Sequence, residues 1–126
     1  MQHIRGNEFL VINIKENNPP VDVALANLEI EIEKAKASGV KVIKVIHGYG
    51  SNGIGGQIAL RIRPLLIQLK KQNVIADYIP GPEWHLGNRK AKNLIYTCND
   101  AAYCTDLSRN NPGITIVALK NIIRWY

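Results

Sequence analysis

The stretch that decides the fold is residues 41–56, which read KVIKVIHGYGSNGIGG. Its first half is a nearly continuous run of branched apolar residues, which is typical of a central strand covered on both faces. The run leads directly into glycines, which permit positive φ and let another molecule approach the backbone closely. The apolar residues that follow keep helical spacing: Ile58, Ile62, Leu65, Leu66 and Leu69. The stretch therefore predicts a strand, a glycine-rich loop and a helix in succession.

Three more strands and one more helix are predicted around this centre. Residues 9–15, 74–79 and 114–119 are rich in branched apolar residues and are bounded by turn-forming sequences. Between the first strand and the central one, an apolar stripe at helical spacing predicts a helix (Val21, Leu25, Leu28, Ile32 and Ala35). Asn18 is expected to cap its first turn.

Two features depart from this simple alternation of strands and helices: Pro64 and the connection of residues 81–111. Pro64 lies inside the second helix, where we expect a kink or an early break. The connection is too long for a plain loop in a compact domain, so residues 93–98 are a candidate short strand and residues 100–107 a candidate short helix.

The resulting order is β-α-β-α-β, a long insertion and a last β, which indicates an α/β fold in which the strand–helix–strand units favour parallel pairing. We expect one domain over residues 1–126, with its core in residues 9–80 and 112–120.

Composition narrows the function classes. The 126 residues carry 16 Lys and Arg against 10 Asp and Glu, a net charge of +6 that favours a polyanionic partner, although many small proteins of other function are as basic. No apolar run approaches the roughly 18 residues of a membrane span, and the start of the chain is a poor signal peptide, so a cytoplasmic protein without membrane contact is expected.

Cys98 and Cys104 form no disulfide framework. The simpler interpretation is two free structural thiols in a reducing compartment, while a local disulfide between them, or a zinc set completed by His85, stays open. The glycine spacing matches neither the Walker A pattern nor the dinucleotide fingerprint. No cofactor or metal is therefore predicted.

The glycine-rich loop carries the clearest chemistry. A helix that starts in a glycine loop offers unpaired N–H groups and the positive end of its dipole, which together favour a phosphate. His47 at the strand end can donate a hydrogen bond to a phosphate oxygen, and Tyr49 can stack on a base or a sugar. The alternative is a tight strand–helix turn that contains a structural histidine.

The sequence V-I-H-G-Y-G, at the end of a branched strand and before a helix, resembles the HGxG signature of the small MutS-related (Smr) domain. The closing GITIVAL is similar to the last strand of that family. The resemblance implies a two-layer α/β sandwich with a mixed four-stranded sheet, like the C-terminal domain of translation initiation factor three. It also implies binding to DNA or RNA and, in many members, endonuclease activity. The residues it implies against the phosphate backbone are His47, Gly48, Tyr49 and Gly50.

The second motif of the Smr family is changed in this chain. The family usually carries Leu-Asp-x-His-Gly at the end of the first strand, with the acid and the histidine implicated in cleavage, and residues 12–16 here read INIKE. Asn13 cannot act as a carboxylate base, and Lys15 is protonated at neutral pH because a lysine pKa is about 10.4. Losing both groups removes acid–base contributions that are typically about 10²–10⁴-fold each. Lys15 can still attract a phosphate.

The sequence therefore favours a nucleic-acid-binding domain without efficient catalysis. The alternatives are a structure-directed endonuclease that uses His47, with His85 or Glu83 from the insertion, and a protein-interaction domain. Whether the protein is an enzyme stays uncertain, and the oligomeric state is open, a monomer included. The candidate nucleic-acid-binding residues are His47, Gly48, Tyr49, Gly50, Asn52, Gly53, Lys15, Arg61, Arg89, Lys90 and Lys92.

Overall fold

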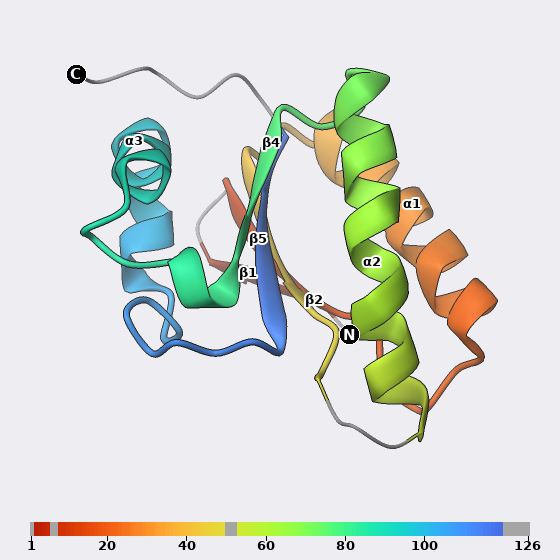
Figure 1. Cartoon of the computed structure of the whole chain (residues 1–126). Helices are drawn as coiled ribbons and strands as arrows, with labels where there is room; N and C mark the ends of the chain where they lie inside the picture. Colours follow the sequence, from red (N-terminus) through yellow and green to blue (C-terminus); the bar gives the residue numbers. More distant parts are fainter. Residues whose placement is uncertain (1, 6–7, 50–52, 120–126) are drawn as a thin grey trace.

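Strand β3 (Val42–Ile46) is the centre of a five-stranded mixed sheet with the order β1-β2-β3-β5-β4 (Figure 1). The computed structural model describes residues 2–5, 8–49 and 53–119. β2 (Phe9–Asn13) is parallel to β3, whereas β5 (Ile114–Ala118) is antiparallel to both β3 and β4 (Asp77–Pro80). The α/β class and the four predicted strands are confirmed.

One strand was not predicted: β1 (Gln2–Arg5) pairs antiparallel with β2 at the edge of the sheet. Its sequence, QHIR, has one branched apolar residue and no alternating pattern, so periodicity does not distinguish it from a polar terminus. The sheet is therefore the predicted four strands with one added at the edge.

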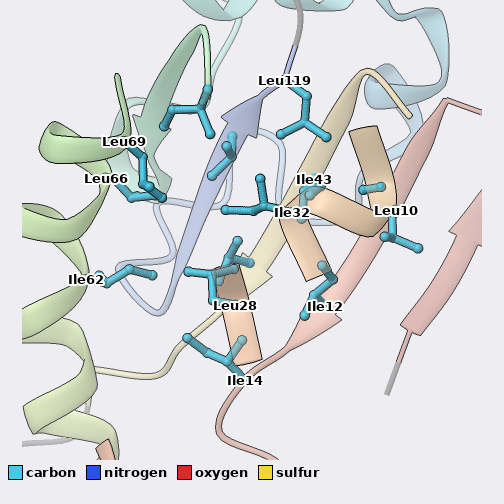
Figure 2. Packing of buried hydrophobic residues seen from close by; sticks show 14 of the residues in the cluster. Leu10, Ile12, Ile14, Leu28, Ile32, Ile43, Ile62, Leu66, Leu69 and Leu119 are labelled. Atoms are coloured by element: carbon cyan, nitrogen blue, oxygen red, sulfur yellow. The ribbon is translucent and has the colours of Figure 1, made fainter. Parts of the chain in front are cut away.

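Helices α1 (Val21–Ala37) and α2 (Gly53–Lys71) cover one face of the sheet (Figures 1 and 2). Their predicted stripes form the core of this face, which is packed against alternate residues of β2, β3 and β5 and includes Leu10, Ile12, Leu28, Ile32, Ile43, Ile58, Ile62, Leu66, Leu69 and Val117. Burial of each large aliphatic side chain contributes about 1.5–3 kcal/mol. This layer therefore supplies much of the stability that fixes the strand ends.

The cap predicted for α1 was wrong, and the early break predicted in α2 is absent. Pro20, not Asn18, precedes the first turn of α1, and no side chain caps that turn. Asn17 and Asn18 instead take positive φ values of 67° and 47°, a conformation that asparagine tolerates, and thereby form the turn after β2. α2 does not break at Pro64 but continues to Lys71. Pro64 is on the exposed side of the helix, where water can satisfy the carbonyl that loses its partner.

The insertion covers the opposite face of the sheet and adds a third layer to the predicted two (Figure 1). It contains two 3-10 turns, η1 (Gly81–Glu83) and η2 (Asn99–Tyr103), and helix α3 (Arg89–Thr97) between them. Its buried residues pack on β3, β4 and β5, and include Trp84, Ala91, Leu94, Cys98 and Ala101.

The strand predicted at residues 93–98 is wrong, because most of this segment belongs to α3. The Asn88 side chain caps the helix by accepting a hydrogen bond from the Ala91 N–H at 2.9 Å. Ala91, Leu94 and Cys98 follow at helical spacing and are buried against the sheet, which short-range β-propensity does not reveal. The short helix predicted at residues 100–107 is present in part, as η2.

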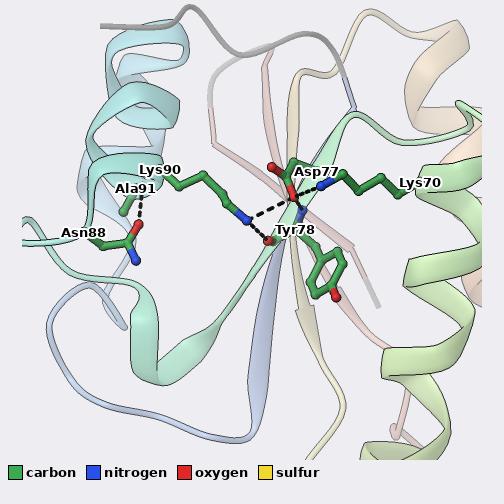
Figure 3. A network of polar contacts seen from close by, with 6 residues as sticks. All are labelled: Lys70, Asp77, Tyr78, Asn88, Lys90 and Ala91. Atoms are coloured by element: carbon green, nitrogen blue, oxygen red, sulfur yellow. Dashed lines mark hydrogen bonds and ion pairs between the residues drawn. The ribbon is translucent and has the colours of Figure 1, made fainter. Parts of the chain in front are cut away.

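One carboxylate ties both helical layers to the sheet. Asp77, at the start of β4, accepts from Lys70 of α2 at 3.1 Å and from Lys90 of α3 at 3.2 Å (Figure 3). Its Oδ1 also accepts from the Tyr78 N–H at 2.8 Å. Burial acts to raise the pKa of Asp77, but these three donors outweigh it, so the pKa lies below its ordinary value.

We predict that Asp77→Asn lowers the free energy of unfolding at neutral pH by about 1.5–3 kcal/mol, because hydrogen bonds to a charged group are lost. Since the folded pKa lies below the ordinary 3.8, this stability is present above that pH and is lost as the pH falls through the folded pKa. Urea unfolding across this range tests the prediction. A difference between variant and parent that persists unchanged in acid would contradict it.

Candidate functional site

The ends of four strands meet at one edge of the sheet, the lower edge in Figure 1. Asn13 at the end of β2 is paired with Ile46 at the end of β3, and Ile46 with Ile114 at the start of β5. α2 begins at the same edge, with Gly53 as its first residue. We call this the loop edge, because β3 leads there into His47, Gly48 and Tyr49, the start of the glycine-rich stretch.

His47 follows β3 and is buried, with a 4% exposed fraction. Its Nδ1 lies 2.7 Å from the Gly48 carbonyl oxygen, and its Nε2 lies 2.9 Å from Thr115 Oγ1. Because a carbonyl only accepts, Nδ1 carries the proton and Nε2 accepts from the Thr115 hydroxyl. Both ring nitrogens are therefore used inside the protein, and the imidazole links the start of the loop to β5.

The pKa of His47 lies below its ordinary value. Burial is the main cause, and the positive charge of Arg63 adds to it, while hydrogen bonds with backbone groups of Gly48 and Ile114 act in the opposite direction. The ring is neutral at pH 7. In this arrangement His47 positions the loop, and a direct contact between its ring and a phosphate stays a prediction.

The backbone of the loop is anchored on Gly113, the residue before β5. The N–H groups of His47 and Gly48 both donate to the Gly113 carbonyl, at 2.9 and 3.0 Å. Gly48 has a φ of 76°, which a side chain would strain. The Tyr49 ring lies so close to Gly113 that an added Cβ there would be 2.8 Å from Tyr49 Cδ1. Tyr49 is thus supported by the β5 end while it remains 64% exposed.

Lys15 also lies at this edge. The Ile14 N–H donates to the Ile46 carbonyl at 3.0 Å, which continues the parallel pairing and brings Lys15 level with Gly48. Lys15 is exposed, and its own N–H donates to Asn13 Oδ1 at 3.1 Å. Asn13 therefore forms a local turn, and the positively charged Lys15 lies beside the start of the loop.

The structure does not bring the basic residues of α3 to the loop edge. Lys90 is bound to Asp77, which is level with Val42, five residues before His47. At about 3.3 Å per residue, the two ends of the sheet are roughly 16 Å apart. Arg89 and Lys92 are exposed in the same first turn of α3 as Lys90. They form a separate basic patch, and their contact with nucleic acid stays a prediction.

Of the remaining predicted residues, Arg61 is described by the structure, whereas two others are not. Arg61, on α2, pairs with Asp22 in the first turn of α1 at 3.1 Å, and both side chains are largely exposed. Arg61 thus lies near the loop-edge end of the helical layer. Gly50 and Asn52 lie outside the described residues.

Sequence reasoning missed Arg109, which lines an open hollow of about 570 Å³ beside the loop edge, together with Tyr49, Thr105, Asn110 and Pro112. The signal that would have found Arg109 is topological. If the last strand is antiparallel to β3, the residues just before it must end up beside the glycine-rich loop.

A buried lysine holds this segment in place. Lys44, in the middle of β3 and 8% exposed, forms an ion pair with Asp106. Asp106 also accepts from Asn111 Nδ2 at 2.9 Å. Burial acts to raise the pKa of Asp106, but the hydrogen bonds from Asn111 and Lys44 and nearby positive charge outweigh it and lower the pKa.

The residues of the alternative hypotheses are not assembled into a second site. Glu83 and His85 are exposed on the insertion, and His85 Nδ1 accepts from the Gly87 N–H at 3.1 Å.

Cys98 and Cys104 are buried free thiols, so the local disulfide is not formed, and burial raises the pKa of Cys98. Within the described ranges, no three His, Cys, Asp or Glu residues lie close enough to hold a metal ion. Nor does any described helix have the length and apolar character needed to cross a membrane.

Comparison with known proteins supports the fold. No protein-family model and no curated protein matches the chain. The structure is similar to the crystal structure of the Smr domain of Thermus thermophilus MutS2, with a TM-score of 0.53 and 19% sequence identity over 90% of this chain and 98% of that one. The resemblance predicted from the sequence is confirmed at the level of the fold, which is similar to that of this Smr domain.

The buried neutral His47 predicts a pH dependence. Because its folded pKa is below the ordinary 6.5, its contribution to stability is fully present above pH 6.5 and is lost as the pH falls through the folded pKa. We expect the free energy of unfolding to fall as the pH is lowered below about 6.5, and to fall less steeply in His47→Gln. The exposed His85→Gln is the matched control in urea unfolding. Equal slopes in all three proteins would contradict the assignment.

Proposed function

We propose that this domain binds DNA or RNA through the phosphate backbone at the loop of residues 47–53 and does not cleave it efficiently. The Smr fold supports this assignment, because the resemblance implies a nucleic-acid-binding domain. The net charge of +6 agrees with a polyanionic partner.

The observation that carries the proposal is the start of α2 at the loop edge, beside an exposed lysine. The helix opens with the sequence Gly53-Ile54-Gly55-Gly56 and has no acidic residue in its first turn. Its unpaired N–H groups and the positive end of its dipole favour an anion, and no local carboxylate competes for them. Lys15, level with Gly48, adds a full positive charge that can bind the neighbouring phosphate of the strand.

The same edge supports binding over cleavage. A general base needs an accessible, unprotonated atom within hydrogen-bond reach of its target. Both ring nitrogens of His47 are engaged by Gly48 and Thr115, the Asn13 amide is neutral, and Lys15 is a cation. Strand cleavage would thus require His47 to leave its buried hydrogen bonds.

Fluorescence anisotropy with labelled single-stranded RNA, hairpin RNA and branched DNA tests the proposal, over about 50–200 mM salt. We expect affinity that falls steeply with salt and strands that stay intact on a denaturing gel. Shortened strands that depend on His47 would favour the endonuclease instead. Absence of binding at low salt would overturn the proposal and favour a protein-interaction domain.

We predict that Lys15→Gln reduces the slope of log affinity against log salt by about 1, because one phosphate contact is lost. Lys71→Gln is the matched control: it removes the same charge from the last turn of α2, at the opposite end of the helix. Equal effects of the two substitutions would show that only net charge matters and would contradict a site at the loop edge.

A further inference from the structure

We propose that the hollow beside Tyr49 takes one unpaired base of the bound strand, so that the domain prefers single-stranded or looped nucleic acid to a duplex. This inference rests on the proposed function, and it adds the part of the ligand that the loop edge alone does not specify. The residues that carry it are Tyr49 and three polar residues of the insertion: Thr105, Arg109 and Asn110.

Tyr49 is the stacking platform. The residue is 64% exposed, although a tyrosine of a small domain gains stability from burial. The ring is nonetheless supported, because one part of it lies against Gly113, where an added Cβ would come within 2.8 Å. An aromatic ring that is held by the backbone and open to solvent can stack on any base, since every base has a π-face.

The other residues that line the hollow include polar partners. Arg109 and Asn110 are exposed, and Thr105 adds a hydroxyl. A guanidinium can stack on a base or bind a phosphate, and the amide can donate to and accept from a base edge. Among the described residues that line the hollow, only Asp106 is acidic, and its charge is balanced by the ion pair with Lys44. The hollow therefore does not repel a polyanion.

The hollow is formed before any ligand arrives. The Ser108 N–H donates to the Trp84 carbonyl at 2.8 Å, and the Asn111 side chain donates to Asp106 at 2.9 Å and accepts from the Gly113 N–H at 2.8 Å. The first contact ties the segment to the buried start of the insertion, the other two fix its internal shape, and the ion pair of Asp106 with Lys44 ties it to the sheet. A preformed site avoids the ordering cost that a mobile loop would pay on binding.

The position of Tyr49 connects the two parts of the ligand. It follows Gly48 directly and precedes the first residue of α2 by four positions. A nucleotide whose phosphate lies at the loop edge can therefore extend its base over the ring. In a duplex that base is paired and stacked on its neighbours, so only an unpaired nucleotide can use the hollow.

The test compares three probes on the full chain: a short labelled oligothymidylate, the same sugar-phosphate chain without bases, and a duplex of equal length. We expect the parent protein to bind the oligothymidylate roughly tenfold more tightly than the chain without bases, which corresponds to one stacked base. Tyr49→Ala should remove this preference, whereas Tyr49→Phe should retain it. Tyr96→Ala, an exposed tyrosine on α3, is the matched control and should behave as the parent.

The outcomes separate the inference from the function on which it rests. If the parent binds all three probes equally, or if Tyr49→Ala keeps the preference for bases, the hollow does not hold a base, although backbone binding at the loop edge stands. If the parent binds none of the probes, both proposals fail. Circular dichroism tests whether each variant is folded. We expect that each is, because both tyrosines are exposed.

Discussion

The pairing of β5 with β3 is the interaction on which the rest of the structure depends. It puts the last strand between β3 and β4, so the residues that precede it must arrive at the end of β3. The Gly113 carbonyl then accepts from both His47 and Gly48, and Thr115 donates to the buried imidazole. Without this register, the glycine-rich loop would have no fixed start and Tyr49 would have no support.

Two buried ionisable residues, Lys44 in β3 and His47 just after it, help to fix the pairing of β5 with β3. They lie on opposite faces of the sheet. His47 lies on the α2 side, where Thr115 is its partner, and is kept neutral by burial. Lys44 lies on the insertion side and keeps its charge balanced by Asp106. A buried ion pair contributes little net stability but strongly disfavours arrangements in which one partner is missing. The pair therefore specifies where the 104–113 segment lies more than it stabilises the domain.

The sequence was sufficient for those features that follow from periodicity. The stripes of α1 and α2 and the four strands are confirmed, because each depends on local pattern and burial. Lys15 was chosen because it stands where the Smr motif has its histidine, and it follows β2, which is parallel to β3 and ends level with it. β1 and α3 were missed or misassigned, since a polar edge strand and a short helix with mixed composition carry weak signals.

The candidate site was predictable only in part, for a related reason. Charge clusters in a sequence do not reveal which end of a sheet they reach: Lys90 is held by Asp77 at one edge, whereas Arg109 lies at the other. Nor does a histidine beside glycines reveal whether its ring faces solvent. Strand order decides which residues become neighbours of these side chains, and the local sequence pattern does not specify strand order.

Amide chemical shifts of the ¹⁵N-labelled domain, titrated with a short single-stranded oligonucleotide at low salt, test the central claim most directly. We expect the largest changes at the start of α2, at Gly48 and Tyr49, and in the 105–113 segment. We expect small changes around Asp77 and the first turn of α3, at the opposite edge. Changes concentrated on α3, with the loop edge unaffected, would contradict the claim.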